Sequence, residues 1–223
     1  MKISNFKLAI GVPCTFPYIP ISFFNSFVMM KKPEFVFIPA DNGPIDTLRN
    51  DIVEIALKEG ATHLLMMDVD QVYHEDTIPA LLDRKKDVVG AMVCRRYPPF
   101  DPVMMRLGDE GYESIPTSEA DETGLVEVDA TGTGCLMFDM QVFKSLPYPW
   151  FKFQKDPNTG LAIGEDIGLC QDLKSKGYRV FVDTTVPAGH LTTLVVNEST
   201  HNLFMAVNNK NAMREALQTV KAT

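Results

Sequence analysis

The sequence lacks any long apolar run. No stretch of about 18 or more apolar residues, the length that suggests a membrane-spanning helix, occurs in the 223-residue chain. The opening segment Met1–Gly11 also lacks the apolar core and the cleavage site of a secretory signal peptide. We therefore expect a cytoplasmic protein without a transmembrane segment.

An excess of positive charge is equally absent, since the formal net charge is −8. Sequence-independent binding to DNA or RNA requires a basic surface, so this function class is disfavoured. The charge does not exclude a phosphate-bearing ligand, because a bound divalent cation changes the field locally.

Cysteine is scarce, and the sequence contains no Cys-x-x-Cys pair. The spacing therefore does not indicate a structural zinc site. We expect buried, reduced thiols instead. The four residues are Cys14, Cys94, Cys135 and Cys170.

Internal repeats are missing too, and short apolar runs alternate with helical stretches. This alternation predicts an α/β layer fold. The expected strands are 7–12, 35–38, 63–67, 87–93, 126–130, 135–138 and 178–182. The expected helices are 46–59 with Asp46 as its cap, 75–83, 164–176 and 197–223.

Two acids directly follow the apolar strand 63–67, in the motif Asp68-Val69-Asp70. The carboxyl end of a central strand is where open α/β sheets bind ligands. Residues i and i+2 of an extended segment point to the same side, so both carboxylates can hold Mn²⁺ or Mg²⁺. The alternative is a solvated turn whose acids cap the next helix.

Glu165 and Asp166 stand at the start of the expected helix 164–176. They are either an N-terminal cap, favoured by the helix dipole, or a carboxylate base that points into a cleft. His190 follows Gly189 after the last expected strand and a short linker. A lone histidine is commonly structural, but a neutral imidazole beside carboxylates also suits Mn²⁺.

The ordered set of Asp-x-Asp, Glu-Asp and Gly-His resembles the GT-A glycosyltransferases. It is most similar to the broad family-two type and its small phage and bacterial relatives, over roughly residues 7–195. The segments 46–50, 87–91 and 130–135 add to the resemblance. It implies one GT-A domain over 1–223, a Rossmann-like mixed central sheet with flanking helices. Residues 1–94 would form the nucleotide-binding half and 95–223 the acceptor and catalytic half.

The resemblance also implies roles for individual residues. The donor would be a UDP- or GDP-sugar whose Mn²⁺ or Mg²⁺ is held by Asp70 and His190, with Asp68 nearby. Asp166 would be the catalytic base, and Glu165 would position the donor or its loop. The expected nucleotide-binding residues are Pro13, Cys14, Arg49, Asp68 and Val69. For Arg49, an ion pair on a helix surface is the alternative.

One stretch departs from the family pattern. Where family-two enzymes have an acid-rich Asp-Asp-Gly-Ser turn that reads the base, this chain has Pro39-Ala40-Asp41-Asn42-Gly43. Asp41 and Asn42 are the candidates to replace that turn, and the base stays open.

Two further segments are candidates for substrate contacts. The stretch 95–127 is rich in proline, glycine and charge, and we expect an irregular lid or acceptor loop in which Arg95 and Arg96 meet an anion. The run Ile19–Met30 is expected as a loop and helix against the core, with a lipid-linked acceptor as the alternative contact. Trp150 and Phe151 either stack on a sugar or pack in a rigid loop.

Other functions stay open at this point. A nucleotidyltransferase also holds Mg²⁺ with acids at strand ends, but the first strand is not followed by a glycine-rich basic loop. A non-catalytic module that binds nucleotide sugars or carbohydrates is the other alternative. The acceptor hydroxyl is unspecified, on a saccharide, a lipid-linked molecule or another compound. The acidic balance disfavours a nucleic acid acceptor, and oligomeric state is open.

Overall fold

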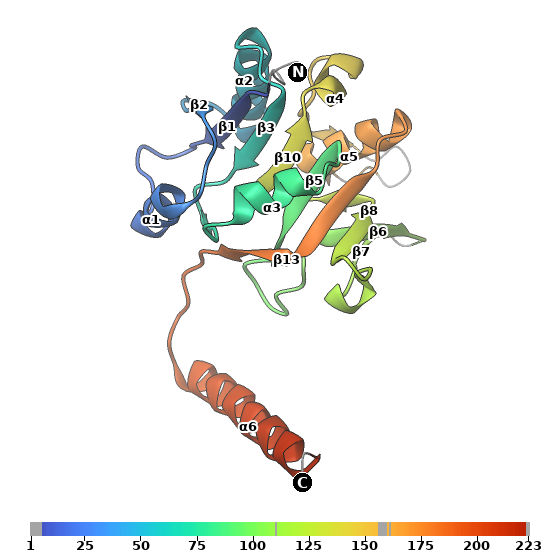
Figure 1. Cartoon of the computed structure of the whole chain (residues 1–223). Coiled ribbons are helices and arrows are strands. Elements are labelled where there is room, and N and C mark those ends of the chain that lie inside the picture. Colours follow the sequence, from blue (N-terminus) through green and yellow to red (C-terminus); the bar gives the residue numbers. More distant parts are fainter. Residues whose placement is uncertain (1–5, 110, 156–159, 161, 222–223) are drawn as a thin grey trace, which may run out of the picture. The chain divides into compact units, whose positions relative to one another are not determined.

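A computed structural model describes residues 6–109, 111–155, 160 and 162–221 (Figure 1). The chain divides into two compact units, Met1–Leu191 and Thr192–Thr223. The second unit contains one long helix, α6 (Glu198–Lys221), with Leu203 and Phe204 exposed on it. No helix within the described ranges is long and apolar enough to cross a membrane.

A mixed β-sheet forms the centre of the first unit (Figure 1). Strand β10 runs antiparallel to both of its neighbours, β3 and β5, whereas β1 pairs in parallel with β2 and β3, and β13 with β5. β8 (Leu125–Val128) pairs with β13 off this path. The strand order is β2 (Phe35–Ala40), β1 (Leu8–Pro13), β3 (His63–Met67), β10 (Cys135–Asp139), β5 (Val88–Val93), β13 (Val180–His190) and β4 (Gln71–Val72).

Helices cover both faces of this sheet. Leu64 and Met66 of β3 belong to a hydrophobic cluster shared with α2, α4 and α5, whereas Leu65 and Met67 belong to a cluster shared with α1 and α3. The continuous apolar run of β3 is therefore buried on both faces, as such a run predicts. The helices are α1 (Ile21–Met29), α2 (Ile45–Lys58), α3 (Thr77–Asp83), α4 (Gln141–Ser145) and α5 (Glu165–Ser175).

The segment 95–127 is more regular than its composition indicates. It contains a hairpin of β6 (Met104–Gly108) and β7 (Gly111–Ser114), a 3₁₀ turn η1 (Thr117–Glu119) and the start of β8. β6 also pairs with β9 (Ala130–Thr131), and β11 (Gln154–Lys155) pairs with β12 (Ala162–Ile163). The prediction of an irregular loop is wrong for residues 104–108 and 111–114. These strands are short and half-exposed, so they leave no strong periodic signal.

The sequence predicts the main elements but misplaces some boundaries. The strand 63–67 is confirmed without change, whereas the strand predicted at 178–182 continues to His190 through a register shift between Asp183 and Pro187. The N-cap of α2 is Pro44, and Asp46 lies inside the first turn. The predicted α/β fold with a mixed central sheet and flanking helices is confirmed. The assignment of 1–223 to one domain with two functional halves stays a prediction.

A buried ion pair provides a test of this packing. Asp183 of β13 is fully buried, and its Oδ2 accepts a 2.6 Å hydrogen bond from Arg84 Nε at the end of α3. We expect Arg84→Ala to lower the free energy of unfolding by about 3 kcal/mol, because it leaves a fully buried carboxylate without its charged partner. Urea unfolding measures this change. Arg179→Ala, which breaks an exposed pair with Glu127, is the control and is expected to change nothing measurable; equal losses would contradict the account.

Candidate active site

Arg49 joins three elements at the carboxyl end of β3. It lies in the first half of α2 and is only 4% exposed. Its Nη2 donates to Asp68 Oδ1 over 3.1 Å, and its Nη1 donates to Glu165 at the start of α5. Burial disfavours the charged guanidinium, but the carboxylates of Asp68 and Glu165 outweigh that cost and raise the Arg49 pKa above its ordinary value. The alternative predicted for Arg49, an ion pair on a helix surface, is therefore right about the ion pairing and wrong about the location, which is buried.

The two acids of the Asp-x-Asp motif have different partners. Asp68 pairs with Arg49, whereas Asp70 Oδ2 lies 3.5 Å from His190 Nε2 and accepts a 2.9 Å hydrogen bond from Arg96. His190 reaches this position because β4 and β13 pair with Gln71 opposite His190. The sequence places His190 after a strand and a linker, but the structure places it within β13.

The tautomer of His190 follows from its other hydrogen bond. Its Nδ1 lies 2.8 Å from the backbone oxygen of Cys94, and a carbonyl oxygen can only accept, so Nδ1 carries the proton. In the neutral ring, Nε2 then directs a lone pair toward the Asp70 carboxylate. Asp70 Oδ2 therefore has two nitrogen neighbours, His190 Nε2 at 3.5 Å and Arg96 Nη1 at 2.9 Å.

This pair fits a divalent cation that takes its remaining ligands from phosphate or water. Among the described residues, no three His, Cys, Asp or Glu side chains form a group that could hold a metal ion. Mg²⁺ commonly uses one or two carboxylates together with substrate phosphates, so a two-residue site is chemically sufficient. Of the three residues predicted as metal ligands, Asp70 and His190 are adjacent, whereas Asp68 is paired with Arg49.

Asp166 lies next to Glu165 but in a different environment. Its Oδ1 accepts the backbone N–H of Ile167 over 2.8 Å, and a Cβ atom at Gly164 would lie 2.9 Å from that same oxygen. Burial raises the Asp166 pKa above its ordinary value, and the positive charge of Arg49 offsets this only in part. Burial likewise raises the pKa of Glu165 in spite of its pairing with Arg49. Both acids lie in the first turn of α5 and line a cavity, but the N-cap is Gly164, so neither acid is the cap residue. The interpretation of one of them as a base stays a prediction.

A cavity of about 190 Å³ lies among these groups, and we call it the inner cavity. It is bounded by the end of β3, the start of α5 and the glycine-rich segment Thr131–Gly134 between β9 and β10. Its polar side chains include those of Arg49, Asp68, Gln71, Thr133, Glu165 and Asp166, with His190 also on its wall.

Two further hollows are connected with the inner cavity in the sense that each shares lining residues with the next. The strand-end pocket, also about 190 Å³, shares Arg49 and Asp68 with it and is lined by Pro13, Val69 and Asp70 as well. The aromatic pocket, about 360 Å³, shares Phe16 with the strand-end pocket. It is lined by Cys14, Phe16, Pro17, Tyr18, Ile19, Pro39 and Asp41. All the residues predicted for nucleotide or metal contacts therefore lie around these three connected hollows.

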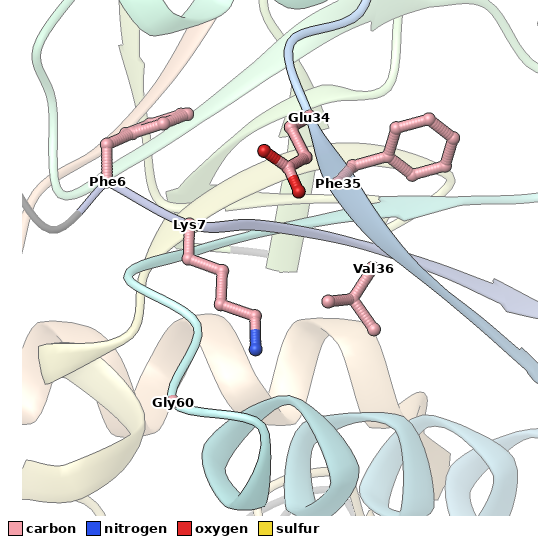
Figure 2. Close-up of a pocket in the computed structure, with 6 residues that line it drawn as sticks. All are labelled: Phe6, Lys7, Glu34, Phe35, Val36 and Gly60. Carbon is pink, nitrogen blue, oxygen red and sulfur yellow. The ribbon is translucent and has the colours of Figure 1, made fainter.

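A larger hollow lies at the opposite end of the strands. Figure 2 shows its lining, where Lys7 extends toward the end of α2 near Gly60. It measures about 410 Å³, but Lys7 already donates to the backbone oxygen and the carboxylate of Glu59. Among the residues that the structure describes, its only other charged lining group is Glu34. The amino end of a parallel sheet is also not where α/β folds bind ligands, so we place the site at the other end.

Sequence reasoning missed several residues of the site. Gln71 lines the inner cavity and belongs to β4, a two-residue strand with no periodic signal. Arg96 meets Asp70, an anion of this chain itself.

Trp150 and Phe151 are buried and pack in the loop after α4, so they do not offer a free face to a sugar.

The comparisons with known proteins bear on the fold alone. No protein-family model matches the chain, and no curated protein matches it. A crystal structure of A197 from STIV matches with a TM-score of 0.57 at 17% identity, over 84% of this chain and 86% of A197. The crystal structure of GalNAc-T7 with UDP, GalNAc and Mn²⁺ matches with a TM-score of 0.58 at 10% identity, over 86% of this chain.

The third likeness is S. aureus TarS 1–349 in complex with UDP-GlcNAc, with a TM-score of 0.54 at 15% identity over 87% of this chain. This chain spans 45% of the GalNAc-T7 structure and 61% of the TarS structure, and both matches therefore concern part of a longer protein. At these identities the likeness establishes the fold, and the predicted GT-A fold is confirmed.

The raised pKa of Asp166 gives a stability prediction. An acid whose folded pKa is raised favours the fold when protonated and costs stability as pH rises through that pKa. Asp166→Asn removes this cost and keeps an oxygen for the Ile167 N–H. We expect the variant to have a Tm a few degrees above wild type at pH 7 and no advantage at pH 3, measured by calorimetry. A lower Tm at pH 7 would contradict the assigned environment.

Proposed function

We propose that this chain is a metal-dependent glycosyltransferase that moves a sugar from a nucleoside diphosphate sugar to a hydroxyl acceptor. The supporting observation is the series of three connected hollows, because a nucleotide sugar has three parts in the same order. The base would lie in the aromatic pocket, the diphosphate in the strand-end pocket and the sugar in the inner cavity.

The aromatic pocket suits a nucleobase. Phe16 and Tyr18 form a stacked pair with ring centroids 5.9 Å apart, and Tyr18 is 71% exposed. Flat aromatic surfaces of this kind hold bases by stacking. Asp41, whose Oδ1 accepts a 2.9 Å hydrogen bond from Asn42, supplies an acceptor for a base N–H, which is the role predicted for this turn.

The strand-end pocket would receive the diphosphate between Arg49 and Asp70. Asp70 and His190 would hold Mn²⁺ or Mg²⁺, which when bound supplies Lewis-acid neutralisation of the leaving diphosphate. Arg49 itself is committed to two carboxylates, so in this proposal it orients Asp68 and Glu165. Arg96 is exposed and lies against Asp70, close enough to contact a phosphate once that carboxylate is engaged.

Asp166 is the proposed base for the acceptor hydroxyl. Burial raises its pKa, so the ionised Asp166 is a stronger proton acceptor than an ordinary aspartate. Glu165 is held by Arg49 and lies against the same cavity, so it positions the site and does not compete for the proton. The acceptor can be a saccharide, a lipid-linked molecule or another hydroxyl compound.

The ligands bound in the structural neighbours support the choice of donor. GalNAc-T7 is described with UDP, GalNAc and Mn²⁺, and TarS with UDP-GlcNAc. A uridine donor and Mn²⁺ are therefore the first reagents to test, with a guanosine donor as the second arm. The narrower assignment to the family-two type remains part of the proposal.

Metal-dependent nucleotide binding is the first test of this function. A ligand that binds only the folded state raises Tm, by about 2.7 kcal/mol of stabilisation at a hundredfold excess over its Kd. We expect UDP or GDP to raise Tm only when Mn²⁺ or Mg²⁺ is present. Asp70→Ala and His190→Ala should each abolish that rise.

Asp83→Ala removes an exposed acid on α3 and serves as the control. Its nucleotide-dependent rise should equal that of wild type. A rise that persists in Asp70→Ala, or that needs no metal in wild type, would refute the cation assignment.

Turnover is the second test. Asp166→Asn should keep metal-dependent donor binding but lose roughly 10²–10⁴-fold in transfer rate, because the base is gone and the shape is preserved. Release of nucleoside diphosphate from a panel of nucleotide sugars gives the rate. Asp172→Asn, on the same helix and paired with Lys152, is the control. Full activity in Asp166→Asn would exclude it as the base.

The same panel separates the alternatives. A nucleotidyltransferase would release pyrophosphate from a nucleoside triphosphate and a sugar phosphate. A non-catalytic module would bind the nucleotide sugar with metal and release nothing with any acceptor.

A further inference from the structure

Unpartnered polar atoms are concentrated in residues that line the inner cavity. Among the described residues, five buried side-chain N or O atoms have no hydrogen-bond partner. Three of the five belong to residues that line this one cavity, namely Arg49 Nε, Gln71 Oε1 and Thr133 Oγ1. Buried polar groups are almost always paired, and leaving one unpaired costs about 1–3 kcal/mol. A cluster of such atoms around one cavity indicates a polar ligand.

Two features determine the position of Gln71, namely the backbone pairing of β4 and the absence of a side chain at Gly134. Strand β4 pairs with β13 so that Gln71 lies opposite His190, and Gln71 is only 3% exposed. A Cβ atom at Gly134 would lie 2.0 Å from Gln71 Nε2 and 2.7 Å from Asp68 Oδ2. Glycine at position 134 therefore leaves room for the amide of Gln71 beside the Asp68 carboxylate.

The three unpartnered atoms have complementary hydrogen-bonding roles. A guanidinium Nε–H only donates, an amide oxygen only accepts, and a threonine hydroxyl does both. Thr133 is 1% exposed and lies in the same glycine-rich segment as Gly134. Residues that carry an unpartnered donor, an unpartnered acceptor and an unpartnered hydroxyl thus line one cavity, and this mixture matches the hydroxyls of a sugar, each of which donates and accepts.

The charge of the cavity wall limits which sugar fits. It carries the carboxylates of Asp68, Glu165 and Asp166, and both terminal nitrogens of Arg49 already contact Asp68 and Glu165. A carboxylate on the ligand would therefore face negative charge. Within the part of the chain that the structure describes, the one guanidinium nitrogen of Arg49 that is not already hydrogen-bonded to a carboxylate is Nε. Like charges at close range in a partly buried site are strongly unfavourable.

We infer that the inner cavity selects a neutral donor sugar and that Gln71 and Thr133 are its specificity-determining residues, through hydrogen bonds to sugar hydroxyls. This inference rests on the proposed glycosyltransferase function. It goes beyond it by naming the class of sugar and the two side chains that distinguish the sugar from the bare nucleoside diphosphate.

The test compares the affinity for the intact donor with the affinity for the nucleotide alone. Titration calorimetry with Mn²⁺ present uses UDP, GDP, UDP-glucose, UDP-N-acetylglucosamine, UDP-galactose, GDP-mannose and UDP-glucuronic acid. The variants are Thr133→Val, which keeps side-chain volume, and Gln71→Leu. Thr77→Val is the matched control, because Thr77 is also 1% exposed with an unpartnered hydroxyl but does not line the cavity.

We expect one uncharged nucleotide sugar to bind wild type at least tenfold more tightly than its nucleoside diphosphate. Thr133→Val and Gln71→Leu should each lower the affinity for that sugar about tenfold, the loss typical of one or two hydrogen bonds. Both variants should bind the nucleoside diphosphate within about twofold of wild type. Thr77→Val should change neither affinity, and UDP-glucuronic acid should bind no more tightly than UDP.

Two outcomes overturn the inference while the proposed function stands. In the first, UDP-glucuronic acid binds as tightly as the best neutral donor. In the second, wild type binds the nucleotide with Mn²⁺, but Thr133→Val and Gln71→Leu leave the preference for the intact sugar unchanged or weaken nucleotide and sugar equally. If wild type binds neither UDP nor GDP with metal, the proposed function fails and the inference fails with it.

Discussion

The buried guanidinium of Arg49 is the interaction on which the site depends. It is the group that joins the end of β3, through Asp68, to the start of α5, through Glu165. Two carboxylates and a cation taken out of water are stable only when each is paired, so α2, β3 and α5 are fixed relative to one another by charge as well as by apolar packing. Among the described residues, Arg49 forms its ion pairs with Asp68 and Glu165 and none with Asp166, and the role proposed for Asp166 as the base rests on this difference.

Strand direction explains why residues distant in sequence meet here. The carboxyl ends of β3 and β5 lie at the same edge of the sheet, and β10 between them runs the opposite way. Its amino end therefore lies at this edge, and the glycine-rich segment before it becomes a wall of the inner cavity. β13 continues past its register shift and pairs with β4. His190, at the end of β13, therefore also lies at this edge of the sheet.

The sequence was sufficient for the fold and for bringing most of the candidate residues to the lining of the three hollows, because both depend on signals that are local. The apolar run 63–67 followed by Asp68 and Asp70 predicts a strand end with acids, and the structure has this arrangement. Partners were not predictable in the same way. That Asp68 pairs with Arg49 and Asp70 with His190 depends on side-chain directions after the strand ends, and Gln71 lies in a pairing too short to leave a pattern.

The position of β10 also bears on the order in which the chain can fold. The strands on either side of it are complete by residue 93, yet the strand that fills the slot begins at Cys135. A nascent chain that has emerged only as far as β5 therefore has an open gap in its sheet, bordered by two apolar strand edges with unpaired backbone groups. Exposed edges of this kind pair readily with strands of other chains. Correct folding therefore requires that the edges of β3 and β5 stay unpaired with other chains until β10 is synthesised.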